Sequence, residues 1–283
     1  MTKEIKKGAA VRLVAYILLI FFAVLAVFPV LILVSRSFFT TSEITSIGAG
    51  VFPKDFTWSS YTEAFSDPVM YSGIKNTLII CLCAVIGVPL TAFMTAYAFT
   101  KIPFFGRKFW FTLGLCTIMI PGILLLLPVY KIFVDIGWYD TLLPLTIPSF
   151  FGGGIMNVFL IMQFLRGLPR DMYEAAEIDG AGVLRKMFQL SLPLIKPVIA
   201  YVAVTAFISS WNDIMRPLLY IQSEENYTIN RFIYEKYLIT KNIYESAPNV
   251  QMAIGVVLML PMVAIFIAFQ KQLIEGIQLT GNK

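Results

Sequence analysis

Residues 168–197 form the polar segment of this 283-residue chain best suited to chemistry or recognition; they read LPRDMYEAAEIDGAGVLRKMFQLSLPLIKP. Asp171 is placed to cap a short helix, and Glu174, three residues later, is placed to close a capping-box pair. Gly180 is placed to end that helix in a left-handed conformation. A second helical run is expected from Val183. The spacing therefore predicts a rigid two-turn helix over residues 171–179.

Two adjacent alanines, Ala175 and Ala176, lie in the middle of this predicted helix. A helix without bulk on one face can lie deep in a groove of another protein. We therefore interpret the segment as a docking element. The alternative is a solvated amphipathic loop, which is the usual reading of a single charged helix.

The residue types that most enzymes need are absent or poorly placed. The chain has no histidine, which excludes imidazole metal sites, Ser/His/Asp systems and histidine proton relays. Its three cysteines, Cys81, Cys83 and Cys116, fall in apolar runs without C-x-x-C spacing, and we interpret them as packing residues. No G-x-x-x-x-G-K-[ST] phosphate loop occurs. We expect no enzyme activity, no metal and no cofactor bound by this chain.

The composition indicates a membrane protein. Hydrophobic residues make up 58% of the chain, charged residues 14%, and the mean hydropathy is +0.78, whereas soluble domains carry about 25% charged residues. The net charge of +5 is compatible with nucleic-acid binding, but the basic residues are scattered over loops and form no stripe. We expect contact with membrane lipid and no nucleic acid.

Charged residues divide the chain into six long uncharged runs, and a spanning helix needs about 20 apolar residues. The fifth run, between Lys196 and Asp213, has only 16 residues, so its helix is expected to start before Lys196. The first run is too long for a secretory signal and is interpreted as an uncleaved helix. We predict one domain, residues 1–283, with spans at about 13–35, 76–100, 109–130, 141–165, 190–212 and 246–270.

The basic residues predict the orientation of these spans. With both termini in the cytoplasm, 14 of the 22 Lys and Arg residues lie inside, as the positive-inside rule requires. Two long loops, 36–75 and 213–245, are then external, and the loop 166–192 is cytoplasmic. The expected location is the bacterial plasma membrane, which is the inner membrane in a cell that has two.

Prolines in or beside the spans and the triplet Gly152-Gly153-Gly154 favour a transporter over an anchor, because broken backbone survives in lipid only where protein or a water-filled cavity satisfies it. Ordinary kinking is the alternative for any single proline.

None of the six runs contains an ionisable Asp, Glu, Lys, Arg or His side chain, which argues against a proton symporter and fits a neutral, hydroxyl-rich solute. Candidate pathway residues with amide or aromatic side chains are Tyr97, Asn157, Gln163, Trp211 and Asn212. Alternatively, such residues tie helices together or mark the membrane interface.

The spacing of Glu174-Ala175-Ala176, Gly180, Leu190 and Leu192-Pro193 resembles the EAA loop of ABC importer permeases, with Leu190 where isoleucine is usual. The resemblance implies an all-α membrane protein with six transmembrane helices, the type I ABC importer permease fold. It also implies that the loop is a coupling helix, which sits in a cleft of the ATP-hydrolysing subunit. The residues carried over to that contact are Asp171, Glu174, Ala175, Ala176, Asp179 and Gly180.

Further motifs resemble those of carbohydrate permeases. Within that group they are similar to the permease subunit that resembles the smaller maltose-transporter subunit. They are Ile102-Pro103-Phe104-Phe105-Gly106-Arg107, Trp211-Asn212-Asp213, Pro217-Leu218 and Gly276. The C-terminal residues 279–283 depart from the Gly-rich ending usual in that group. The resemblance implies a sugar or oligosaccharide as solute.

The same resemblance implies a heterodimer with a second homologous permease, two ATP-binding cassette subunits that use ATP and Mg²⁺, and an extracellular solute-binding protein. An ABC permease for an amino acid, a peptide or an anion shares the EAA loop and remains an alternative. A secondary carrier explains the spans but not the EAA spacing. For the external segment 221–245, with Tyr227, Phe232, Tyr234 and Tyr237, two interpretations stay open: contact with the binding protein, or a cap over the helix ends.

Overall fold

The computed structural model describes residues 2–239 and 247–281, and within them the backbone forms helices and no strand. This confirms the all-α prediction. Contacts gather into two compact units, one holding Met1–Pro68 with Tyr237–Pro261 and the other Val69–Lys236 with Met262–Lys283. The prediction of one domain over residues 1–283 stays a prediction.

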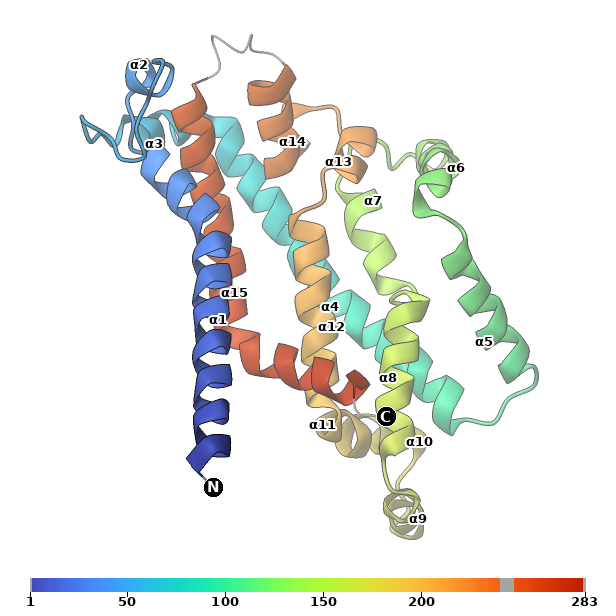
Figure 1. Ribbon diagram of the computed structural model, residues 1–283. Coiled ribbons are helices and arrows are strands. Elements are labelled where there is room, and N and C mark those ends of the chain that lie inside the picture. The colour runs from blue at the N-terminus through green and yellow to red at the C-terminus, as the bar shows by residue number, and fades with distance from the viewer. Residues whose placement is uncertain (1, 240–246, 282–283) are drawn as a thin grey trace. The chain divides into compact units, whose positions relative to one another are not determined.

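The first unit contains one long helix, two short helices and the first part of another long helix (Figure 1). These are α1 (Thr2–Arg36), α2 (Thr41–Ile44), α3 (Ser59–Ala64) and α15 (Pro248–Gly281), of which the residues up to Pro261 belong here. The π-helix η5 (Tyr234–Ile239) is also shared between the two units.

A buried asparagine organises the polar interior of the first unit. The Asn249 side-chain amide is 1% exposed and donates to the Phe39 carbonyl at 3.1 Å and to Ser60 Oγ at 2.9 Å, while its oxygen accepts from Thr41 Oγ1 at 3.3 Å. Because a buried amide without partners is costly, Asn249 fixes the start of α15 against the ends of α1 and α3.

The second unit contains the remaining described elements, many of them short. In chain order they are α4 (Pro68–Lys101), α5 (Arg107–Cys116), η1 (Thr117–Met119), α6 (Gly122–Asp135), α7 (Leu143–Thr146), η2 (Ile147–Phe150), α8 (Ile155–Gly167), α9 (Arg170–Ile178), α10 (Val183–Arg185), η3 (Lys186–Ser191), α11 (Leu192–Leu194), α12 (Lys196–Trp211), α13 (Met215–Tyr220), η4 (Glu224–Asn226) and α14 (Ile229–Ile233).

Three long helices, α4, α8 and α12, build the core of the second unit. Small and large side chains alternate on α4, where Ala92 and Ala96 lie beside Phe93 and Tyr97. The other buried core residues come from α8 and α12 and from the segments that flank them, and they are Val158, Ile161, Met162, Leu165, Tyr173, Met187, Ile195, Val198 and Val202. Dense packing of this kind makes the three helices a rigid frame for the segments between them.

Four helices among the described residues are long and apolar enough to cross a membrane: Val11–Arg36, Pro68–Lys101, Leu143–Gly167 and Pro248–Lys271. Two bent helix pairs raise the number to six if each pair is one span. The predicted six spans therefore remain compatible with the structure, but the count stays a prediction. Residues 11–31 of α1 are exposed on every side, as expected for an apolar helix that faces lipid.

The two bent helix pairs lie at the predicted third and fifth spans. The third bends by 104° between α5 and α6, where Ile120 is extended because the following proline disfavours helical backbone. The fifth bends by 82° at Ile195, whose φ is −109°. Within the predicted span 190–212, the residues before the bend form η3 and α11, and α12 starts at Lys196.

Candidate functional site

The predicted docking helix is α9, and its two ends differ in how well the sequence predicted them. It begins at Arg170 with Pro169 at the cap position and no side-chain cap, so the predicted capping box of Asp171 and Glu174 is wrong. The Asp171 carboxylate lies in the first turn, where the positive end of the helix dipole stabilises a negative charge.

The C-terminal end of α9 agrees with the sequence prediction. Gly180 has φ of +73°, its N–H donates to the Glu177 carbonyl at 3.0 Å, and the Ala181 N–H donates to the Ala176 carbonyl at 2.8 Å. These two bonds form a Schellman motif, which satisfies the last carbonyls and stops the helix. The helix is therefore short and well terminated.

Tyr173 attaches α9 to the rest of the second unit. Its ring is buried, and its hydroxyl lies 2.8 Å from Ser191 Oγ. Ser191 donates its one hydroxyl proton to the Lys186 carbonyl at 2.9 Å, so Tyr173 is the donor in the first bond. Burial raises the pKa of Tyr173. Lys101 Nζ also lies 3.9 Å from the ring centroid of Tyr173, in reach of a cation–π interaction.

A second attachment lies one turn further along α9. Lys186 Nζ contacts Glu177 Oε1 at 2.6 Å, and this hydrogen bond and charge hold the pKa of Glu177 below its ordinary value. Lys186 and Ser191 both belong to η3, which leads into the fifth span. Two bonds one turn apart fix the direction as well as the position of α9 relative to η3.

The opposite face of α9 is open. Glu174, Ala175 and Asp179 are exposed, Ala176 is half-buried, and Ile178 is 88% exposed. Arg170 forms an exposed pair with Glu174 at 3.5 Å, which stabilises the helix only slightly. An exposed isoleucine beside two alanines is a small apolar face with an acidic rim. The sequence analysis missed Ile178, although its three-residue spacing from Ala175 places both on one face.

The glycine triplet separates η2 from α8 within the candidate span Leu143–Gly167. Gly152, Gly153 and Gly154 have φ of +77°, +63° and +78°, a run of conformations that side chains rarely allow. A Cβ on Gly153 would lie 2.5 Å from the Val88 carbonyl oxygen and 2.6 Å from Ala92 Cβ. The triplet thus lets the backbone pass close to α4, and Asn157 donates to the Gly153 carbonyl at 2.7 Å, which helps to fix this segment.

A cavity of about 410 Å³ lies beside the glycine triplet, and Asn157 is the one predicted pathway residue that lines it. Tyr97 instead lines a separate cavity of about 500 Å³ behind α9, together with Lys101 and Tyr173. Asn157 and Tyr97, which the sequence suggested as parts of one solute pathway, therefore line different cavities.

The other predicted pathway residues line neither cavity. Trp211 is buried and stacks on Phe207, with ring centroids 5.6 Å apart. Gln163 and Asn212 are exposed, and Asn212 donates to the Ile208 carbonyl at 2.9 Å. The sequence analysis missed the hydroxyl residues that line the 410 Å³ cavity, which are Ser149, Thr205, Ser209 and Ser210.

No group of three or more His, Cys, Asp or Glu side chains among the described residues is placed to hold a metal ion.

The described part of the predicted external segment, residues 221–239, is folded. Asn76 of α4 donates to the carbonyls of Glu225 and Tyr227 at 2.9 Å each, and Thr77 Oγ1 accepts from the Ile229 N–H at 3.0 Å. These contacts favour the interpretation as a cap for this part; residues 240–245 lie outside the described residues.

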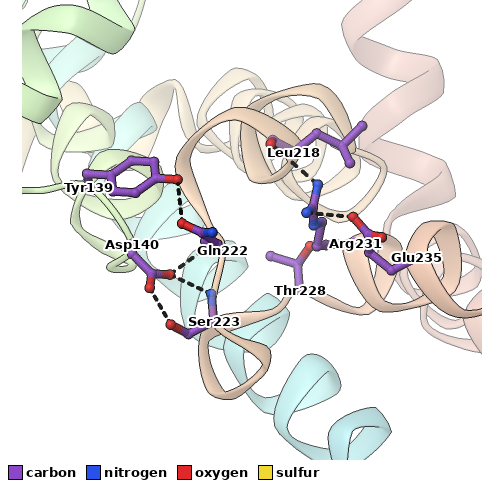
Figure 2. Close-up of polar contacts among 8 residues, drawn as sticks. All are labelled: Tyr139, Asp140, Leu218, Gln222, Ser223, Thr228, Arg231 and Glu235. Atoms are coloured by element: carbon purple, nitrogen blue, oxygen red, sulfur yellow. Dashed lines mark hydrogen bonds and ion pairs between the residues drawn. The ribbon is translucent and has the colours of Figure 1, made fainter.

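Asp140 ties this cap to the turn before α7 (Figure 2). Its carboxylate accepts from the N–H groups of Gln222 and Ser223 at 2.8 Å each and from the Ser223 hydroxyl. Tyr139 also donates to the Gln222 side chain at 3.0 Å. Asp140 has φ of +56°, an unusual value for a residue other than glycine. Further along, Arg231 pairs with Glu235 at 2.6 Å.

Replacing Asp140 with asparagine is expected to loosen the cap, since bonds to a charged acceptor stabilise by about 1.5–3 kcal/mol. Burial acts to raise the pKa of Asp140, but the bonds from Ser223, Gln222 and Asn226 outweigh it and hold the pKa below its ordinary value. The carboxylate therefore stabilises the fold at neutral pH, and its contribution is lost as the pH falls below about 4. Hydrogen exchange at Gln222 and Ser223 should be faster in Asp140→Asn at pH 7, and the difference should shrink in acid.

Asp135→Asn is the matched control, because Asp135 forms an exposed pair with Lys131 at 2.9 Å and such pairs contribute little. Equal exchange in the two variants would show that Asp140 does not hold the cap.

The fold defines the class of the protein. A chain in the crystal structure of a bacterial ABC transporter involved in the import of the acidic polysaccharide alginate superposes with a TM-score of 0.82 at 22% identity, covering 92% of this chain and 95% of that one. The protein thus has the helical fold of a chain of that transporter.

Residues 87–278 match the family of binding-protein-dependent transport system inner membrane components, and the chain belongs to this family. It is 30% identical to the arabinooligosaccharides transport system permease protein AraQ of Halalkalibacterium halodurans, over 93% of each chain. It is also 30% identical to the galactooligosaccharides transport system permease protein GanQ of Bacillus subtilis, over 100% of each. Family membership confirms the resemblance read from the EAA spacing and makes the chain a permease subunit, not an enzyme.

Proposed function

We propose that this chain is the permease subunit of an ATP-driven importer that takes up a neutral sugar or oligosaccharide delivered by an extracellular solute-binding protein. Two relatives with 30% identity are named for arabino- and galactooligosaccharides, which supports the solute class. The observation that carries the coupling role is α9: a short helix with an open apolar face, attached from behind by Tyr173 and Glu177.

In this proposal α9 is the coupling helix and enters a cleft on the ATPase subunit. The contact is made by Asp171, Glu174, Ala175, Ala176, Asp179 and Gly180, to which the open face adds Ile178. Closure of the ATPase dimer on ATP favours the outward-facing arrangement, and α9 transmits that bias as a population shift. Its two bonds to η3 pass a movement of α9 directly to the fifth span.

The proposed assembly contains a second homologous permease as heterodimer partner and two ATP-binding cassette subunits, which bind ATP and Mg²⁺. It lies in the bacterial plasma or inner membrane, with both termini and the loop 166–192 in the cytoplasm. The solute path is proposed to pass Tyr97, Asn157, Gln163, Trp211 and Asn212. Asn157 has the strongest support, because it lines a cavity beside the glycine triplet.

A photo-crosslinking residue at position 175, in cells that make the complete transporter, is expected to capture the ATPase subunit. Ala175 is exposed on α9, so the probe is a short uncharged diazirine side chain, which leaves the core undisturbed and adds far less bulk to the docking face than an arginine. The matched control is the same probe at Phe109, a residue of α5 that is 64% exposed. ATPase activity of the purified assembly should also rise with a binding protein loaded with neutral oligosaccharide.

Two results would refute this proposal. If the probe at position 175 captured no nucleotide-hydrolysing subunit, or captured it no more than the probe at 109, α9 would not be the coupling helix. If amino acids or peptides stimulated hydrolysis and sugars did not, the solute class would be wrong.

A further inference from the structure

The 410 Å³ cavity beside the glycine triplet is lined by several neutral polar side chains. Ser149 and Asn157 come from either side of the glycine triplet, and Thr205, Ser209 and Ser210 come from α12. Apolar walls are provided by Val88 and Phe151. The volume lies within the roughly 300–1,000 Å³ of ordinary ligand pockets.

The hydroxyl groups on α12 are in register. Thr205 and Ser209 are four residues apart, and Ser210 follows Ala206 at the same spacing, so they line one side of the helix. Thr205 donates its proton to the Val202 carbonyl at 3.0 Å and so offers the cavity an acceptor. Asn157 uses one N–H proton on Gly153 and keeps its oxygen and second proton. Such a set of neutral donors and acceptors suits the hydroxyl groups of a sugar.

The one charged residue in the lining is Arg216, and its charge is balanced. Arg216 Nε donates to Asp213 Oδ2 at 2.5 Å, and the Arg216 N–H donates to Asp213 Oδ1 at 3.3 Å. The Asp213 side chain is 15% exposed, against 37% for Arg216. Asn230 donates to the carbonyls of Trp211 and Asp213, which fixes the turn that carries the carboxylate.

We propose that this cavity is a subsite for a neutral sugar unit and that Asp213 is its specificity-determining residue. Paired with Asp213, Arg216 offers a solute N–H donors but little net charge. Without the carboxylate, the guanidinium is the group best suited to bind a carboxylate on the solute. Asp213 therefore excludes acidic sugars such as uronic acids. This inference rests on the proposed function, because it assumes that a sugar enters the chain.

The test uses the complete transporter with Ser209→Cys, and mass spectrometry follows alkylation of that cysteine in the presence of galactose or galacturonic acid. The two probes differ only at C6, where the acid carries a carboxylate. With Asp213 intact, galactose should slow alkylation at least about threefold and galacturonate should not. In Asp213→Asn, galacturonate should protect at least as well as galactose.

Arg216→Gln, alone and combined with Asp213→Asn, is the control that assigns the effect to the guanidinium: galacturonate should protect neither variant. Basal ATPase activity and subunit assembly report whether each variant is folded. If Asp213→Asn assembles poorly, Asp213→Glu is the second variant: it keeps a carboxylate beside Arg216 and should still exclude the acid. Protection by galacturonate with Asp213 intact, or by neither sugar, would overturn the inference. Capture of the ATPase from position 175 would be unaffected by that failure, so the proposed function would stand.

Discussion

Gly153→Ala is expected to lower the free energy of unfolding by about 3 kcal/mol. The left-handed conformation at φ +63° costs an alanine about 1 kcal/mol. The added Cβ would lie 2.5 Å from the Val88 carbonyl oxygen and 2.7 Å from the Ala92 nitrogen. Both contacts are backbone atoms of a packed helix, so relief requires a shift of the whole turn, at a further cost of about 2 kcal/mol.

Two alanine variants separate these contributions. Gly152 has φ of +77° with nothing within 4 Å of a Cβ, so Gly152→Ala reports backbone strain and should cost about 1 kcal/mol. On α4, a Cβ at Gly87 would lie 2.8 Å from the Ser149 carbonyl oxygen, so Gly87→Ala reports close packing, with a helix-propensity gain of about 1 kcal/mol in its favour.

Denaturation of the purified variants in detergent, followed by circular dichroism, measures the difference. The packing account requires Gly153→Ala to be clearly less stable than Gly152→Ala. If the two unfold at the same denaturant concentration, the close approach of the triplet to α4 does not contribute, and only the left-handed backbone does.

Ala175→Arg is expected to reduce transport at least about tenfold while leaving the permease folded. Ala175 is exposed and lies in the middle of α9, and arginine is a good helix former, so the helix should persist. A long cationic side chain cannot enter a groove shaped for a methyl group; overpacking of about 2 kcal/mol corresponds to roughly 30-fold weaker binding. Co-purification of the ATPase subunit and solute uptake in vesicles measure the two effects.

Ala175→Ser is the matched control, since it keeps the small volume and the exposure. It should retain most of the transport and ATPase binding. Normal uptake by Ala175→Arg would mean that the open face of α9 touches no partner during transport.

Features that depend on residues close together in the chain were predicted well. The docking helix was expected over residues 171–179 and is observed over Arg170–Ile178, and Gly180 has the expected left-handed backbone. The error at its start has a local cause: the helix begins at Arg170, so Asp171 lies inside the first turn and is not at the cap position.

Features that depend on the meeting of distant segments were predicted poorly. The uncharged runs indicated where apolar segments lie, but not the bends at Ile120 and Ile195. Periodicity and charge do not report the backbone angle at a single residue, and prolines beside a span are compatible with a straight helix, a kink or a break. The bond of Tyr173 to Ser191 was also missed, because it joins residues 18 positions apart.

The sequence by itself determined that this chain lies in a bilayer, is helical and carries an EAA loop, because composition and short-range spacing are sufficient for those conclusions. Only the tertiary structure decided which polar side chains share a cavity. Asn157 meets Ser209 and Arg216 there, whereas Tyr97 lies in the cavity behind α9 and Gln163 is exposed. The physical reason is that the packing of α4, α8 and α12 and the close approach of Gly153 to α4 set these distances, and both arise from contacts between residues far apart in the chain.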